Sequence, residues 1–302
     1  MLYLENLVMF TAVNSVFALG ANIAVGYSGL LSVGHAVFLA SGAYTTALLL
    51  RTSYFGGGSV QLYPDYLMVL AASVGVSALV GLVLALPALK LRDDYFLMAT
   101  LAFGESIQDV LVAGDTWSGG SLGLRAIPGL EDLSRMPDGS TLILFALVVV
   151  VATYWMCRWI ENSHFGLALR TVAENDSLSV TLGQSPAWLK TRALLVSGGT
   201  CGAAGSLLAL YLSYIDPGFF GIQESVLVLA MVVVGGLGRR TGALVGAVTL
   251  TTLPDLLVFL DIPSRFDASI RQITYGMLLI LIMHFRPKGL IGGGQVGGAT
   301  SS

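Results

Sequence analysis

The chain has 302 residues, of which 15 are Lys or Arg and 18 are Asp or Glu, so charged residues make up only 11%, against roughly 25% in soluble domains. Hydrophobic residues reach 55% and glycine occurs 37 times, which indicates a helical membrane protein and argues against a soluble enzyme. The formal net charge of -3 offers no basic face to a nucleic acid, so we expect no nucleic-acid partner.

Nine apolar segments approach the length of about 20 helical residues that crosses about 30 Å of hydrocarbon. In chain order they span 7–25, 30–50, 66–89, 95–112, 141–160, 193–214, 225–237, 241–260 and 270–285. The seventh is too short for a full span, which predicts a half-span or a re-entrant helix. The expected fold class is therefore all-α, a polytopic bundle with eight or nine hydrophobic segments, some broken or re-entrant. This transmembrane domain occupies 1–290, and a flexible tail follows at 291–302.

The basic residues predict how the bundle is oriented. If the nine segments alternate, ten of the fifteen Lys and Arg residues fall on one side, and basic residues in short loops are retained on the cytoplasmic side. We therefore expect the amino terminus outside, the carboxyl terminus inside, an outer loop at 113–140 and an inner loop at 161–189. Glu5 stands where a signal peptide carries basic residues, so we expect no cleavable signal.

The sequence contains no motif for covalent chemistry. It lacks a Gly-rich turn ahead of Lys and Ser or Thr, which would hold ATP phosphates, and it lacks an HExxH zinc helix. The three histidines are far apart, Cys157 and Cys201 match no metal-binding spacing, and no GxSxG turn suggests a protease. We expect no catalytic residue, metal or cofactor on this chain. We expect instead that the chain forms a path through the membrane and that the energy for transport has another source.

Polar residues inside the apolar segments mark a candidate substrate pathway, because ionisable groups at membrane depth are costly. Glycines, serines and His35 interrupt the stretch at 26–44, which predicts a broken helix that exposes backbone groups toward a cavity. In the fourth segment, an acid and an amide share one helical face. The candidate pathway residues are Ser32, Gly34, His35, Glu105 and Gln108. The alternatives are that His35 caps or packs a helix end and that Glu105 is a structural acceptor.

The inner loop at 161–189 has the pattern of a short amphipathic helix on the membrane surface. Apolar side chains recur at helical spacing between Phe165 and Ala173, while polar side chains face elsewhere, and Gly183 and Pro186 would end the helix. One interpretation is membrane-surface packing alone. The other is a coupling helix that fits into a groove of a cytoplasmic motor. The residues assigned to coupling are Arg170, Glu174, Asn175 and Gly183.

Six ordered stretches together resemble the permeases of branched-chain amino acid ABC transporters, specifically the LivM-type members of the LivH/LivM family. They are GYSGLLSVGHAVFLASGAY, LKLRDDYFLMATLAFGES, GGSLGLRAIPGL, LRTVAENDSLSVTLGQSPAWLK, YLSYIDPGFFGIQESVLVLAMVVVGGLG and FRPKGLIG. The resemblance covers about 22–292. Many members carry Asp where this chain has Leu122, less basic residues at Arg239 and Arg240, and an extra hydrophobic segment ahead of Leu7.

The resemblance implies an inner-membrane permease subunit that works by alternating access. A second, homologous permease would pair with it, two ATPase subunits would bind ATP and Mg inside, and a periplasmic or extracytoplasmic binding protein would deliver substrate. Glu174, Asn175 and Gly183 carry the ATPase-coupling assignment through the AENDSLSVTLG run. The implied substrate is a branched-chain or other hydrophobic amino acid, with urea or short amides as the alternative within the family. Outside the family, a proton-coupled secondary transporter using His35 or Glu105 and a passive channel are the rivals.

Overall fold

The computed structural model describes residues 2–55, 64–88, 93–115, 117–125, 127, 140–258, 276–277 and 289–291. The predicted ninth segment at 270–285 lies outside these residues apart from 276–277, as does the predicted tail beyond 291. Most of the predicted outer loop between 126 and 139 also lies outside them.

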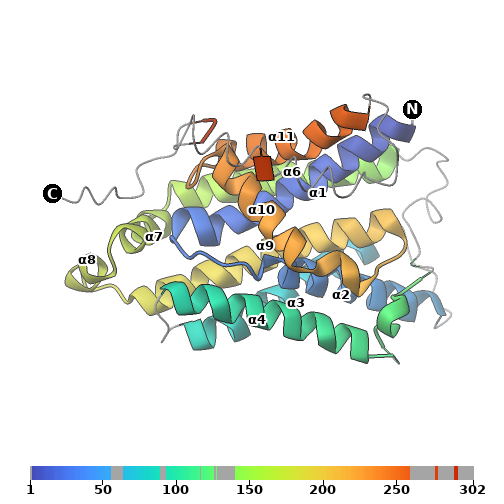
Figure 1. Ribbon diagram of the computed structural model, residues 1–302, viewed down its shortest axis with the longest axis horizontal. Coiled ribbons are helices and arrows are strands. Elements are labelled where there is room, and N and C mark those ends of the chain that lie inside the picture. Colours follow the sequence, from blue (N-terminus) through green and yellow to red (C-terminus); the bar gives the residue numbers. More distant parts are fainter. Residues whose placement is uncertain are drawn as a thin grey trace.

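The described chain is helical, with helices that run mostly along one long axis (Figure 1). The elements are α1 (Leu2–Asn22), the π-helix η1 (Ile23–Tyr27), α2 (His35–Phe55), α3 (Pro64–Ala88), α4 (Asp93–Ala113), η2 (Gly120–Leu122), α6 (Ser140–Glu161), α7 (His164–Glu174), α8 (Asp176–Thr181), α9 (Pro186–Leu212), η3 (Pro217–Phe220), α10 (Ile222–Gly235) and α11 (Arg240–Val258). Among these residues the extended pairing is a single antiparallel bridge between Leu124 and Ile215.

The all-α prediction is confirmed. Within the described residues, five helices are long and apolar enough to cross a membrane: α1 with η1, α3, α4, α6 and α9. α10 has 14 residues, so the seventh segment is short, as predicted. Two predicted segments had wrong boundaries. α2 runs from His35 to Phe55 rather than from 30 to 50. α9 begins at Pro186 rather than at 193, because Ser185 caps its first turn by accepting a bond from the Trp188 amide.

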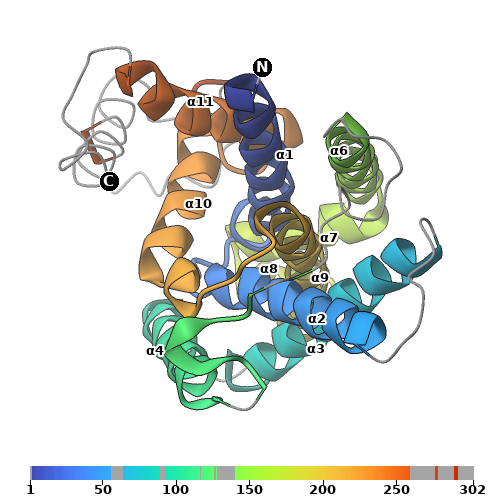
Figure 2. The ribbon, with the colours of Figure 1, turned by 90° about the vertical axis from the view of Figure 1, so that its right-hand side faces the viewer.

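α9 forms the centre of the bundle, where it packs against α1, α2 and α3 (Figure 2). Its glycines allow this close approach. A β-carbon on Gly42 of α2 would lie 2.6 Å from the Gly202 α-carbon, and one on Gly198 would lie 2.7 Å from the Ser77 carbonyl oxygen of α3. Helices in membranes associate through such small residues, because lipid tails are as apolar as the side chains and provide no hydrophobic driving force between helices.

Hydroxyl groups join the same three helices. The Thr46 Oγ1 of α2 lies 2.7 Å from the Ser73 Oγ of α3 and 2.8 Å from the Ser206 Oγ of α9. One turn earlier on α2, Ser41 Oγ lies 2.8 Å from Ser77 Oγ. These bonds satisfy polar groups that would otherwise meet hydrocarbon. The packing of α2, α3 and α9 therefore holds α2 in place within the bundle.

The two ends of the bundle differ. α7 and α8 lie together at one end, and η2 and η3 lie at the other (Figure 1). We call these the α7 end and the η3 end. The predicted inner loop is at the α7 end, and the part of the predicted outer loop between 117 and 125 is at the η3 end. The side of the membrane that each end faces stays a prediction.

Candidate functional site

A break in the helical chain lies between η1 and α2. Residues 28–34, which we call the broken segment, leave the helical path after Tyr27 and rejoin it at His35. Gly29 has φ of +70°, a conformation that glycine adopts without the steric cost paid by other residues. The prediction that this stretch is not one continuous span is thus confirmed.

Three predicted pathway residues are enclosed here. Ser32, Gly34 and His35 are all buried. The His35 Nδ1 lies 3.1 Å from the Ser32 carbonyl oxygen, so the proton on Nδ1 is donated to that oxygen and Nε2 is left as an acceptor. Nε2 is buried and has no hydrogen-bond partner among the described residues. These side chains therefore do not line an open channel in this conformation, and His35 keeps one polar atom for a further contact.

Two helices, α4 and α10, hold the broken segment and the first turn of α2. The Val33 amide donates to the Thr100 Oγ1 of α4 at 3.2 Å, and the Ala36 amide donates to the Ser225 Oγ of α10 at 3.0 Å. Gly34 packs directly on α4, since a β-carbon there would lie 2.6 Å from the Thr100 carbonyl oxygen. A shift of either α4 or α10 would therefore pull on the backbone beside His35.

Glu105 and Gln108, the other two predicted pathway residues, lie farther along α4 toward the η3 end. Both are half-buried, and Gln108 lies next to Gly221, the residue that precedes α10. In the described part of the chain, no hydrogen bond joins either of them to His35. The structure therefore separates the predicted pathway residues into a buried group at the broken segment and a second group on α4.

The predicted single helix in the inner loop is in fact two helices. Ser163 caps α7 by accepting a bond from the Gly166 amide at 3.2 Å. Asn175 then interrupts the helix with an extended backbone, and its Oδ1 accepts a bond from the Ser177 amide at 2.8 Å to cap α8. Asn side chains compete with the helix in this way. Gly183, with φ of +74°, follows α8.

The predicted faces of α7 are confirmed. Leu169 and Val172 are buried on the bundle, whereas Arg170 and Glu174 are exposed. α7 also touches the broken segment, because a β-carbon on Gly29 would lie 3.1 Å from the Ala173 α-carbon. The surface helix and the interrupted membrane segment are therefore in direct contact.

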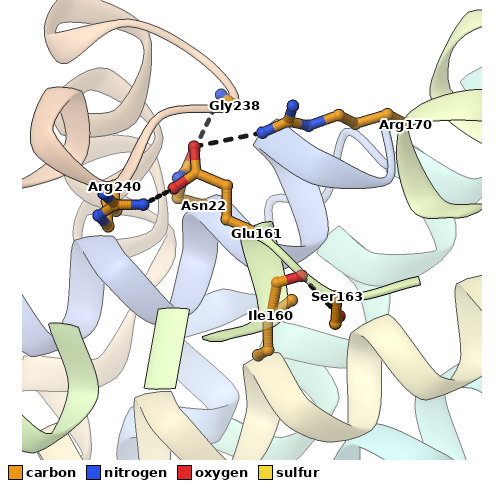
Figure 3. Close-up of polar contacts among 7 residues, drawn as sticks. All are labelled: Asn22, Ile160, Glu161, Ser163, Arg170, Gly238 and Arg240. Carbon is orange, nitrogen blue, oxygen red and sulfur yellow. Dashed lines mark hydrogen bonds and ion pairs between the residues drawn. The ribbon is translucent and has the colours of Figure 1, made fainter. Parts of the chain in front are cut away.

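Glu161, the last residue of α6, joins two more elements at the α7 end (Figure 3). Its Oε1 accepts a bond from Arg170 of α7 at 3.2 Å, and its Oε2 pairs with Arg240 at the start of α11. Beside it, the Gly238 amide donates to the Asn22 Oδ1 of α1 at 3.1 Å. A cavity of about 620 Å³ lies among these groups, with Tyr27 and Glu174 in its lining.

Sequence reasoning did not assign roles to Glu161, Asn22, Thr100 or Ser225. Two of them carried a readable signal. Glu161 is an acid that ends a span between Arg158 and Arg170, and Asn22 is an amide inside an apolar segment. Thr100 and Ser225 carried none, because a hydroxyl in a membrane helix usually bonds back to its own helix.

At the η3 end, two loops are clipped together. The Leu124 and Ile215 backbones exchange hydrogen bonds of 2.8 and 3.0 Å, and the Tyr214 hydroxyl donates to the Leu122 carbonyl oxygen at 3.2 Å. Asp216 caps η3 by accepting a bond from the Gly218 amide at 2.6 Å. The part of the outer loop at 122–124 is therefore bonded to the turn between α9 and α10.

Known proteins resemble this chain along most of its length. The family model described as "Branched-chain amino acid transport system / permease component" matches residues 3–283. The high-affinity branched-chain amino acid transport system permease protein LivM of Salmonella typhimurium is 32% identical, covering 93% of this chain and 68% of the relative. LivM of Escherichia coli is 31% identical with the same coverage. A probable LivH of Methanocaldococcus jannaschii is 27% identical over 86% of both chains. No solved structure matches.

Proposed function

The chain belongs to the family of permease components of branched-chain amino acid transport systems, and from this membership we propose that it is the transmembrane permease subunit of an ABC importer. Partner ATPases bind ATP and Mg and hydrolyse the nucleotide, and a binding protein delivers the substrate outside. The substrate is a branched-chain or other hydrophobic amino acid, as the names of the relatives suggest. The α7 end faces the cytoplasm.

The observation that carries the proposal is the contact between α7 and the broken segment. α7 buries one face on the bundle and leaves Arg170 and Glu174 exposed for a partner. α7 also contacts Gly29, six residues before His35. A push on α7 from an ATPase therefore reaches the interrupted membrane segment without passing through a flexible linker. A channel or a proton-coupled transporter gives no role to such a surface helix.

The exposed face of α4 supports a second permease as partner. Between 66 and 86 of α3 and between 141 and 161 of α6, the exposed residues are apolar or glycine, apart from Arg158 in the last turn of α6, so these parts of both helices suit contact with lipid. α4 is less buried than either, yet its exposed face includes Ser106 and Asp109, with Glu105 half-buried beside them. Because ionisable groups in hydrocarbon are costly, this face suits another protein or an aqueous path.

Reconstitution tests the proposal. The chain, a candidate second permease, two ATPases and the binding protein are placed in proteoliposomes, and uptake of labelled leucine is measured with and without internal ATP. We expect uptake that needs ATP. Uptake that proceeds equally without ATP would refute the importer and favour a channel or a secondary transporter.

The role of α7 is tested with Glu174→Lys in the same assay. We expect the variant to assemble and hydrolyse ATP while losing most of its uptake, because the reversed charge disturbs the exposed face of α7. Asp115→Lys is the matched control, since it reverses an exposed carboxylate at the η3 end. Equal uptake by Glu174→Lys and wild type would remove α7 from the coupling route.

A further inference from the structure

We propose that Glu161 transmits movement between α7 and Arg240 at the start of α11, and through Arg240 to the preceding turn at 236–239, which joins α10 to α11 and which we call the α10–α11 turn. This role rests on the proposed function, because it concerns how a push on α7 spreads through the permease. Glu161 would be a positioning residue, since it touches neither nucleotide nor the enclosed His35.

The two bonds of Glu161 connect opposite walls of one cavity. Ala173 and Arg170 of α7 form one wall, and Leu237, Gly238 and Arg240 form the other. Tyr27 and Gly26 of η1 also line it. The cavity has a volume of about 620 Å³, so side chains of the described residues do not fill the space between the walls. The Glu161 carboxylate spans it by pairing with Arg170 on one side and Arg240 on the other (Figure 3).

The two bonds differ in strength. The Glu161 side chain is 14% exposed and that of Arg240 is 22% exposed, whereas that of Arg170 is 46% exposed. Solvent screens the more exposed pair, while a pair removed from water interacts more strongly and leaves an uncompensated charge when one partner is lost. The Arg240 guanidinium is also positioned over the Tyr154 ring of α6, 5.4 Å from its centroid. The ion pair of Glu161 with Arg240 is therefore the stronger of the two, and the ion pair with Arg170 is the one that breaks more easily.

The α10–α11 turn also contacts α1 and η1, the helices that precede the broken segment. The Gly238 amide donates to Asn22 at the end of α1, and a β-carbon on Gly26 of η1 would lie 2.5 Å from the Gly238 nitrogen. At the other end of α10, Ser225 holds the Ala36 amide next to His35. A movement that Glu161 passes to this turn therefore reaches both η1 and α10, in addition to the direct contact of α7 with Gly29.

Two other charged groups line the cavity. Arg239 donates to the Ile291 carbonyl oxygen at 3.1 Å, so its guanidinium is held away from Glu161. Glu174 lies on the α7 wall and is exposed. In the part of the chain that the structure describes, no ion pair joins either group to the opposite wall, whereas Glu161 pairs with both Arg170 and Arg240.

Charge-neutral variants test the proposal in the reconstituted complex. The variants are Glu161→Gln, Arg240→Gln and Arg170→Gln, and Arg158→Gln is the control because Arg158 lies one turn earlier on α6 and stacks on the Trp155 ring. Leucine uptake and ATP hydrolysis are measured on the same vesicles. For Glu161→Gln and Arg240→Gln we expect uptake per ATP to fall about threefold to tenfold, with a smaller fall for Arg170→Gln. The control should keep the wild-type ratio, and wild-type ratios in all three test variants would overturn the proposal.

A second readout does not depend on transport. Spin labels on Leu167→Cys of α7 and Thr241→Cys of α11 report the distance between the walls in the purified chain, since both positions are exposed. We expect a narrow distribution in wild type and a broader one when Glu161→Gln or Arg170→Gln is added. An unchanged width of the distance distribution would overturn the proposed role of Glu161, whatever the uptake assay shows. Uptake that is independent of ATP would refute only the importer function. Arg170→Gln, at an exposed site, serves if Glu161→Gln does not fold.

Discussion

Replacing Gly42 by alanine should separate α2 from α9. The added β-carbon would lie 2.6 Å from the Gly202 α-carbon, where ordinary contacts begin at 3.4 Å. The helices would therefore have to move apart by about 1 Å at this point, because backbone atoms of α9 cannot rotate away as a side chain can. One turn further on, the Thr46–Ser206 hydrogen bond of 2.8 Å would be stretched out of range.

The energetic cost can be set from these two effects. Overpacking of a close contact costs about 1–3 kcal/mol, and loss of an interhelical hydrogen bond in a membrane protein costs about 0.6 kcal/mol on average. Together they predict a destabilisation of about 2–4 kcal/mol. Since each 1 kcal/mol lowers Tm by about 2–4 °C in chains of 150–250 residues, we expect a fall of roughly 4–16 °C.

Thermal unfolding in detergent, followed by fluorescence-detected size exclusion, measures this fall. Gly75→Ala on α3 is the control, because a β-carbon there meets nothing within 4 Å. It should leave Tm unchanged or raise it slightly, since alanine favours a helix by about 1 kcal/mol over glycine. If Gly42→Ala melts at the same temperature as Gly75→Ala, the close packing of α2 on α9 is refuted.

Three further predictions concern other contacts. Gly29→Ala should lower Tm and leucine uptake together, because an L-residue at φ of +70° costs about 1–2 kcal/mol and the new methyl group presses on α7. Asp216→Ala should cost about 1 kcal/mol by removing the η3 cap and should speed amide exchange at 218–221, where wild-type exchange rates would contradict the cap. The thiols of Cys157 and Cys201 are fully buried, so a maleimide should label them only after denaturation in SDS, and rapid labelling of the folded chain would show that these helix contacts are wrong.

Residue pattern alone predicted most of the helices. Eight of the nine apolar runs correspond to helices of the described chain, with the short seventh run at α10, because burial in lipid depends on local composition. The apolar spacing around Leu169 gave the faces of α7 for the same reason. The division of the inner loop at Asn175 was not predicted, because an Asn side chain can cap a new helix or lie on the surface of a continuous one.

What the sequence by itself determined is an all-helical membrane chain with an interrupted second segment, no ATP-binding motif and an amphipathic surface helix. Each of these depends on residues close together in the chain. Only the tertiary structure decided that Glu161 pairs with Arg240, 79 residues away, and that Asn22 holds Gly238, 216 residues away. Such pairs depend on which helices the glycines of α9 allow to pack together. The helices could therefore be predicted from local sequence, whereas the contacts that connect α7 with α11 and η1 could be known only from the packed bundle.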